Sequence, residues 1–310
     1  MLSVVAPDGV PEIAEGTDLA AVLLPLLDLR DGDILVITSK VVSKAEGRVV
    51  TGDREEWITR ETDRVVATRG ATRIVRNRLG LTMAAAGVDA SNVAVGSIVL
   101  LPEDPDRSAR ALRAAVRSRA GVNVGVVVTD TAGRAWREGQ TDIAIGAAGV
   151  VVAESFVGRE DAHGNPLVVT APAVADEIAS AAELAQGKLG ARPCAVVRGR
   201  ADLVLAPEDD GSGAAALIRA DGGDLFGYGA REAVLRALTG DPSDAAAFGA
   251  PVPAEELVDV LARVQVHAIP VEDGLECDAD RGEVARAVAF AHGWTGSPTG
   301  GRLRLRPRLP

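Results

Sequence analysis

The chain has 310 residues, of which 47% are hydrophobic and 25% charged, values typical of a globular protein that buries a full core. A net charge of -11 and an aromatic content of 3% argue against a nucleic-acid partner, which would need basic surfaces and stacking rings. No apolar run approaches the roughly 18 residues that span a membrane, and no signal peptide is evident at the start. Cys194 and Cys277 match no metal or redox spacing. We therefore expect a soluble, cytoplasmic protein with reduced thiols and no membrane partner.

Short apolar runs alternate with alanine-rich segments along the chain, which predicts a mixed α/β fold. In chain order we expect a strand at 33–39, a helix at 109–118, a strand at 122–128, a closely packed Gly/Ala/Val-rich segment at 144–154, a short strand at 167–170, a helix at 175–187, a strand at 194–197 and a helix at 254–264.

A turn or linker at residues 240–244 divides the chain into a domain of residues 1–240 and an extension of residues 241–310. Near the C-terminus, residues 300–306 alternate arginine with apolar side chains. Because prolines follow, we favour a solvated tail over an edge strand for this segment.

Residues 126–142, with the sequence VVVTDTAGRAWREGQTD, are the most informative segment. The β-branched run predicts a buried strand that ends at Asp130 and Thr131. Ligands of open α/β sheets bind beyond the carboxyl ends of strands, where these oxygens would suit a hard cation. Arg134 and Arg137 follow in a glycine turn and would suit phosphate. The alternative is a solvated polar loop.

Two other segments carry related chemistry. Lys40 and Lys44 follow the strand predicted at 33–39, and helical spacing would place both ammonium groups on one face, toward a chain of phosphates. A solvated basic turn is the alternative. Asp89 and Asn92 lie in a turn-rich segment whose alternative is a structural Asx turn.

Several common catalytic motifs are absent. The sequence has no P-loop, no Gly-x-Gly-x-x-Gly after a strand and no His-Glu-x-x-His. Its three histidines, His163, His267 and His292, share no spacing typical of metal ligands or of a catalytic triad. The remaining oxygen ligands, lysines and arginines suit phosphoryl chemistry with Mg²⁺ or Mn²⁺.

Taken together, four segments resemble the signatures of the coenzyme F420-0:L-glutamate ligase family, the gamma-glutamyl ligases of deazaflavin coenzyme biosynthesis. In order, they are GVPEI at 9–13, TSKVVSKAEGR at 38–48, AAGVDASNV at 85–93 and TDTAGRAWREGQTD at 129–142. Further segments resemble the actinobacterial branch: VADEI at 174–178, AVVRG at 195–199, DDGS at 209–212 and DLF at 224–226. The resemblance covers roughly residues 5–240.

This resemblance implies an α+β fold unlike P-loop or Rossmann folds, an intertwined homodimer, and a GTP-dependent ligase with two Mg²⁺ or Mn²⁺ ions, leaving a K⁺ requirement open. The metal ligands would be Asp89, Asp130 and Thr131. GTP would be contacted by Val10, Pro11, Glu12, Ile13, Ser39, Lys40, Lys44 and Asn92. We expect Asp130, Lys44 and Arg134 to serve catalysis. Arg137 and Gln140 belong to the same signature, but the resemblance itself assigns them no role.

The implied reaction activates an acyl group. The terminal phosphoryl group of GTP would pass to the lactyl carboxylate of coenzyme F420-0, and the amine of L-glutamate would then displace phosphate, leaving GDP; further glutamates, if added, would be γ-linked. Two alternatives stay open: a nucleotide-dependent ligase or phosphotransferase acting on another carboxylate, and a non-catalytic nucleotide-binding homologue.

The sequence departs from the family pattern in two places. Archaeal members carry a metal-ligating glutamine after the helix, where this chain aligns Lys188. A protonated lysine cannot ligate a metal, so either Gln186 substitutes, one metal has a different shell, or Lys188 contacts phosphate. Longer relatives also continue into a flavin-binding domain. Here residues 250–258 resemble only its beginning, so we expect no flavin.

Overall fold

The computed structural model describes residues 1–224 and 226–308. Two compact units divide the chain: residues 1–64 with 75–218 form the first, and residues 65–74 with 219–310 form the second. The longer segment of the second unit begins at Arg219, whereas the sequence predicts a division at residue 240. Across the described ranges, no helix has the length and apolar character needed to cross a membrane.

The first unit is built on a five-stranded sheet. Its strands, in spatial order, are β1 (Ser3–Val5), β12 (Cys194–Arg198), β2 (Ile34–Thr38), β8 (Gly125–Gly133) and β9 (Gln140–Ala148). β2 and β8 are parallel, and the other neighbours are antiparallel. This mixed sheet with its helices confirms the predicted mixed α/β class.

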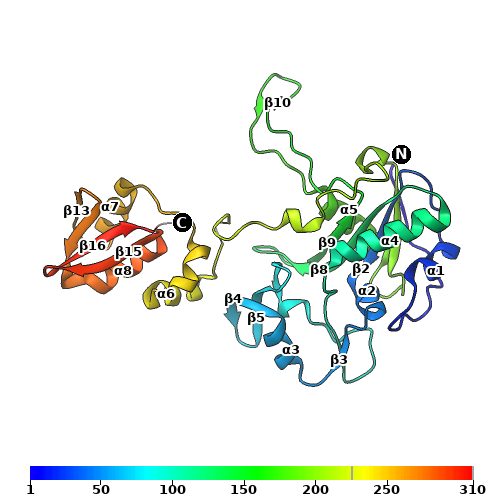
Figure 1. The fold of residues 1–310 in the computed structure, drawn as a ribbon, viewed down its shortest axis with the longest axis horizontal. Helices are drawn as coiled ribbons and strands as arrows, with labels where there is room; N and C mark the ends of the chain where they lie inside the picture. Colours follow the sequence, from blue (N-terminus) through cyan, green and yellow to red (C-terminus); the bar gives the residue numbers. More distant parts are fainter. Residues whose placement is uncertain (225, 309–310) are drawn as a thin grey trace. The chain divides into compact units, whose positions relative to one another are not determined.

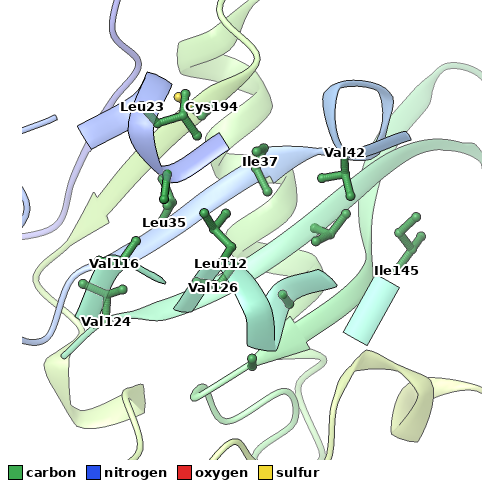
Figure 2. Close-up of a cluster of buried hydrophobic side chains, with 14 of the residues drawn as sticks. Leu23, Leu35, Ile37, Val42, Leu112, Val116, Val124, Val126, Ile145 and Cys194 are labelled. Atoms are coloured by element: carbon green, nitrogen blue, oxygen red, sulfur yellow. The ribbon is translucent and has the colours of Figure 1, made fainter. Parts of the chain in front are cut away.

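Helices lie on both faces of the sheet (Figure 1), and alternating side chains of its strands belong to two separate buried clusters. Leu35 and Ile37 of β2 join one buried cluster with α4 (Pro105–Ala120), α1 (Leu19–Leu23) and α2 (Ser39–Ala45), part of which Figure 2 shows. Val36 joins the opposite cluster with α5 (Val174–Gln186). Each fully buried Leu, Val or Ile contributes ~1.5–3 kcal/mol to stability.

Asp104 caps α4 by accepting a hydrogen bond from Arg107 N at 2.9 Å, and Gly121 ends the helix at a φ of 72°.

The backbone of β9 packs closely against α4, as its glycine-rich sequence predicts. A Cβ on Gly146 of β9 would lie 2.4 Å from the carbonyl oxygen of Pro105. Only glycine allows this approach of strand and helix.

Smaller elements complete the first unit. They are η1 (Leu24–Leu26), β3 (Val49–Thr51), α3 (Arg54–Glu61), β6 (Thr82–Ala84), η2 (Ala85–Gly87), β7 (Ser97–Val99), β10 (Arg159–Glu160), β11 (Pro166–Leu167), η3 (Ala201–Leu203) and η4 (Ala214–Leu217). β4 (Thr62–Arg69) and β5 (Thr72–Asn77) are divided between the units, because residues 65–74 belong to the second. The β10–β11 hairpin extends away from the central sheet of its unit (Figure 1).

The second unit has its own core. It contains α6 (Ala230–Thr239), η5 (Pro242–Phe248), α7 (Ala254–Arg263), β13 (Ala268–Val271), β14 (Gly274–Asp278), η6 (Ala279–Arg281), α8 (Gly282–Ala291), β15 (Trp294–Thr299) and β16 (Arg302–Pro307). The four strands form an antiparallel sheet of order β13-β14-β16-β15.

The prediction of a solvated tail at residues 300–306 is wrong. β16 pairs on both sides within this sheet, and Leu303 and Leu305 are buried in its core. The alternating arginines lie on the other face, where Arg304 and Arg306 both pair with Asp273. The carboxylate of Asp273 thus offsets part of the positive charge of these arginines.

Both cysteines are buried and unpaired, as expected. Burial raises the pKa of the Cys194 thiol to about 12, so this side chain is an unreactive part of the core.

Candidate active site

A cavity of about 1040 Å³ opens in the first unit at one edge of the central sheet. The parallel ladder of β2 and β8 ends there, at Thr38 and Thr129, and β12 begins beside it. The end of α5 reaches the same edge. All of the predicted nucleotide and metal residues line the cavity: Val10, Pro11, Glu12, Ile13, Ser39, Lys40, Lys44, Asp89, Asn92, Asp130 and Thr131.

The predicted helical spacing of the two lysines is confirmed by α2, which begins at Ser39 directly after β2. Lys40 Nζ lies 2.6 Å from Asp89 Oδ2, and Lys44 Nζ lies 2.5 Å from Glu12 Oε1. Lys44 is buried, with a side chain 9% exposed, whereas the carboxylate of Glu12 is mostly exposed. Each ammonium group is therefore held inside the cavity by a carboxylate from a different loop.

The loop that carries Asp89 is conformationally strained. Ala85, Ala86 and Asn92 have φ values of 51°, 57° and 56°, in the left-handed region that costs a residue with a Cβ ~1–2 kcal/mol. Burial disfavours the charge of Asp89, but hydrogen bonds from Lys40 and Ser91 outweigh it and lower the pKa to about 2. Asp89 is thus a fixed anion in the cavity wall.

Asp130 and Thr131 lie inside β8, not at its end as predicted. The strand continues to Gly133 because β9 pairs with it as a hairpin, with Thr131 opposite Asp142. Ser39 Oγ donates a 2.8 Å hydrogen bond to Asp130 Oδ1. Burial, reinforced by the negative charges of Asp142 and Asp89, raises the pKa of Asp130 to about 6. A half-buried carboxylate close to two other carboxylates favours a bound cation.

Asp142 was not singled out by the sequence analysis, although it ends the signature segment 126–142. It is 4% exposed, and its two carboxylate oxygens accept hydrogen bonds from Thr129 Oγ1 at 3.0 Å and Thr131 Oγ1 at 2.8 Å. Since the proton of the Thr131 hydroxyl points to Asp142, the lone pairs of that hydroxyl remain available to the cavity.

The two arginines of the signature segment lie outside the cavity wall. Arg134 and Arg137 are exposed in the loop between β8 and β9 and do not line the cavity. The guanidinium of Arg134 donates to the carbonyl oxygen of Glu138 within the same loop. Gln140, at the start of β9, does line the cavity.

The end of α5 and the loop that follows it form another wall, lined by Glu183, Gln186, Lys188 and Arg192. Gln186 is 4% exposed, and neither its Oε1 nor its Nε2 has a hydrogen-bond partner. Arg192 pairs with Asp8, while Lys188 is exposed at the cavity. Sequence alignment drew attention to Gln186 and Lys188, whereas no local pattern pointed to Glu183.

In the described part of the chain, no three His, Cys, Asp or Glu side chains come together as a ready metal site. The mixed sheet and its charged cavity define a mixed α/β protein with residues suited to a phosphate-bearing ligand and a hard cation. The F420-0:Gamma-glutamyl ligase family model matches residues 9–55 and 53–199, so the chain belongs to this family.

Similar proteins support the assignment. A Coenzyme F420:L-glutamate ligase from Methanopyrus kandleri is 38% identical over 240 residues, covering 69% of this chain and 93% of that protein. Proteins of the same name are 39% identical over 214 residues in Archaeoglobus fulgidus, covering 62% of this chain and 85% of theirs, and 35% identical over 223 residues in Haloarcula marismortui, covering 64% and 87%.

Proposed function

We propose that this chain is a GTP-dependent ligase that joins L-glutamate to coenzyme F420-0 through an acyl phosphate. The observation that carries the proposal is the gathering of the predicted nucleotide and metal residues around one cavity, in a member of a family whose relatives are named Coenzyme F420:L-glutamate ligase. A cavity of about 1040 Å³ has room for a nucleotide together with its acceptor.

Charge in the cavity supports the nucleotide end of the reaction. A carboxylate approaches a polyphosphate only when their mutual repulsion is screened. Lys40 and Lys44 lie in the cavity wall, and their ammonium groups would offset the charge of the β- and γ-phosphates. The γ-phosphoryl group would then bond to the acceptor carboxylate as its bond to GDP breaks.

The residues present fit a divalent cation. Asp130 is a half-buried carboxylate that forms no ion pair among the described residues, and Thr131 presents a hydroxyl oxygen beside it. Asp89 would add a second carboxylate. Mg²⁺ binds through one or two carboxylates and completes its shell with water and substrate phosphates, so a cluster of three acidic residues is not required. When bound, the cation would neutralise charge on the transferring phosphoryl group.

We also propose that the protein is a homodimer. The β10–β11 hairpin exposes apolar side chains on an arm that leaves the sheet of its unit, and Val168 and Val169 are 69% and 84% exposed (Figure 1). Such an arm is suited to pairing with a second copy. Sedimentation measures the molar mass of the protein and of a Val168→Asp/Val169→Asp variant. We expect the mass of a dimer for the protein and that of a monomer for the variant. A monomeric unmodified protein would contradict the homodimer, and a dimeric variant would contradict the role of the arm.

The test of the ligase is mass spectrometry of coenzyme F420-0 incubated with GTP, L-glutamate and Mn²⁺. We expect glutamyl mass increments that Asp130→Asn abolishes. The control is Asp202→Asn, which neutralises a surface partner of Arg200 outside the cavity and should retain activity. Release of GDP without glutamylation would instead assign the phosphoryl chemistry to another acceptor.

A further inference from the structure

Lysine is rare in this chain, and its positions are informative. Of the 33 lysine and arginine residues only Lys40, Lys44 and Lys188 are lysines. All three line the same cavity, whereas all of the other Lys and Arg residues in the chain are arginines. Lysine offers a compact ammonium charge where arginine offers a planar fork, and the two are not interchangeable in a binding site. The third lysine therefore belongs to the cavity's chemistry as the other two do.

The three lysines differ in their partners. Lys40 and Lys44 are each held by a carboxylate, whereas Lys188 has neither an ion pair nor a hydrogen bond among the described residues. Lys188 lies two residues after the end of α5. The loop that carries it lines a different wall of the cavity from the segments predicted to bind the nucleotide. Its ammonium group is available for an anion.

A second observation on the same wall points to a ligand. Gln186 is 4% exposed, and both polar atoms of its amide lack a partner. A buried amide without hydrogen bonds costs ~1–3 kcal/mol, so this arrangement calls for a ligand in the working protein. A metal ion would use only Oε1 and leave the Nε2 donor buried and unpaired. A ligand that both accepts and donates hydrogen bonds satisfies both atoms.

Glu183 adds the opposite charge. It lies three residues before Gln186 on α5, and this spacing places both side chains on the face that lines the cavity. The wall thus presents a carboxylate, an amide and an ammonium group in succession. An amino acid complements this wall, because it carries an ammonium group for Glu183 and carboxylates for Lys188.

We propose that Glu183, Gln186 and Lys188 form the subsite for the incoming amino acid, a zwitterion with an additional carboxylate such as L-glutamate. This assignment rests on the proposed ligase function and supplies the acceptor end of its cavity. In the second step the glutamate ammonium loses one proton to the carboxylate of Glu183. The resulting amine nitrogen bonds to the acyl carbon, the bond from that carbon to the phosphate oxygen breaks with its electron pair leaving on phosphate, and the second nitrogen proton leaves with the departing phosphate.

The test measures binding directly as well as turnover. Equilibrium dialysis with labelled L-glutamate in the presence of GDP and Mn²⁺ compares the unmodified full chain with Lys188→Met and Glu183→Gln. We expect each change to weaken glutamate binding about tenfold to a hundredfold, equivalent to ~1.4–2.8 kcal/mol, with the KM for GTP unchanged. Glu177→Gln makes the same chemical change at an exposed site of α5 outside the cavity, and should bind glutamate normally.

The outcomes separate this subsite from the ligase itself. Failure of the unmodified protein to glutamylate coenzyme F420-0 would reject the proposed function, while dialysis would still report on the subsite. Normal glutamate binding by Lys188→Met, or no binding by the unmodified protein, would overturn the subsite. For Gln186→Met we expect weaker glutamate binding and unchanged Mn²⁺ binding; weaker Mn²⁺ binding with normal glutamate binding would assign Gln186 to a cation and overturn its place here.

Discussion

Replacing Gln186 with methionine should stabilise the free protein, although the change removes a polar group from the cavity. The amide is 4% exposed and unpaired at both polar atoms. Leaving an amide buried in this way costs ~1–3 kcal/mol in mutational data. Methionine is unbranched and of similar length, so it fills the same space without that cost. We therefore expect the free energy of unfolding to rise by ~1–3 kcal/mol.

Calorimetry of the full chain measures this effect. For a domain of 150–250 residues, each kcal/mol raises Tm by roughly 2–4 °C. Gln265→Met, at an exposed glutamine of the second unit, is the matched control and should leave Tm unchanged. L-Glutamate with GDP should raise the Tm of the unmodified protein more than that of Gln186→Met. A lower Tm for ligand-free Gln186→Met would show that the amide is already satisfied, and would refute the reasoning.

Three further changes test the fold and the site. Gly146→Ala places a Cβ 2.4 Å from the carbonyl oxygen of Pro105, so we expect a loss of ~1–3 kcal/mol in urea unfolding; an unchanged midpoint would contradict this close packing. Burial and Asp142 raise the pKa of Asp130 to about 6, so the folded protein binds more protons than the unfolded chain and loses stability as pH rises from about 4 through 6. Asp130→Asn should flatten that slope in metal-free buffer, and a persistent slope would assign it to another group. Leu305→Ala removes a fully buried side chain of β16 and should cost ~2–5 kcal/mol by calorimetry, whereas a solvated tail would show no change.

Helices and strands whose buried hydrophobic residues repeat at the regular spacing of that element were predictable from the sequence. The apolar runs at 33–39 and 194–197 correspond to β2 and β12, and the helical spacing at 175–187 corresponds to α5. In each case the hydrophobic pattern repeats with the period of the element and is bounded by polar or glycine residues. Their boundaries differ from the predicted ones by only a few residues, since helix and strand ends depend on local capping and pairing.

Elements whose ends depend on distant partners were not predictable. β8 was expected to stop at its polar residues, but Asp130 and Thr131 stay in the strand because β9 supplies their backbone partners. Likewise β16 was expected to be solvated because proline follows it, yet β14 and β15 pair with it on both sides. In β8 the polar side chains face the cavity, and in β16 the charged side chains face acidic partners. In a sequence alone, such residues look the same as residues that follow the end of a strand.

The candidate site divides in the same way. Signature segments identified the residues on the wall formed by α2 and β8, because each carries several functional side chains within a short stretch. The wall at the end of α5 carries isolated residues, and neither Glu183 nor Lys188 belongs to a pattern with chemical meaning by itself. Their relation arises only when antiparallel β12 brings the α5 loop to the edge where β2 ends. The scarcity of lysine was visible in the sequence, but it becomes an argument about function once the fold places all three lysines around one cavity.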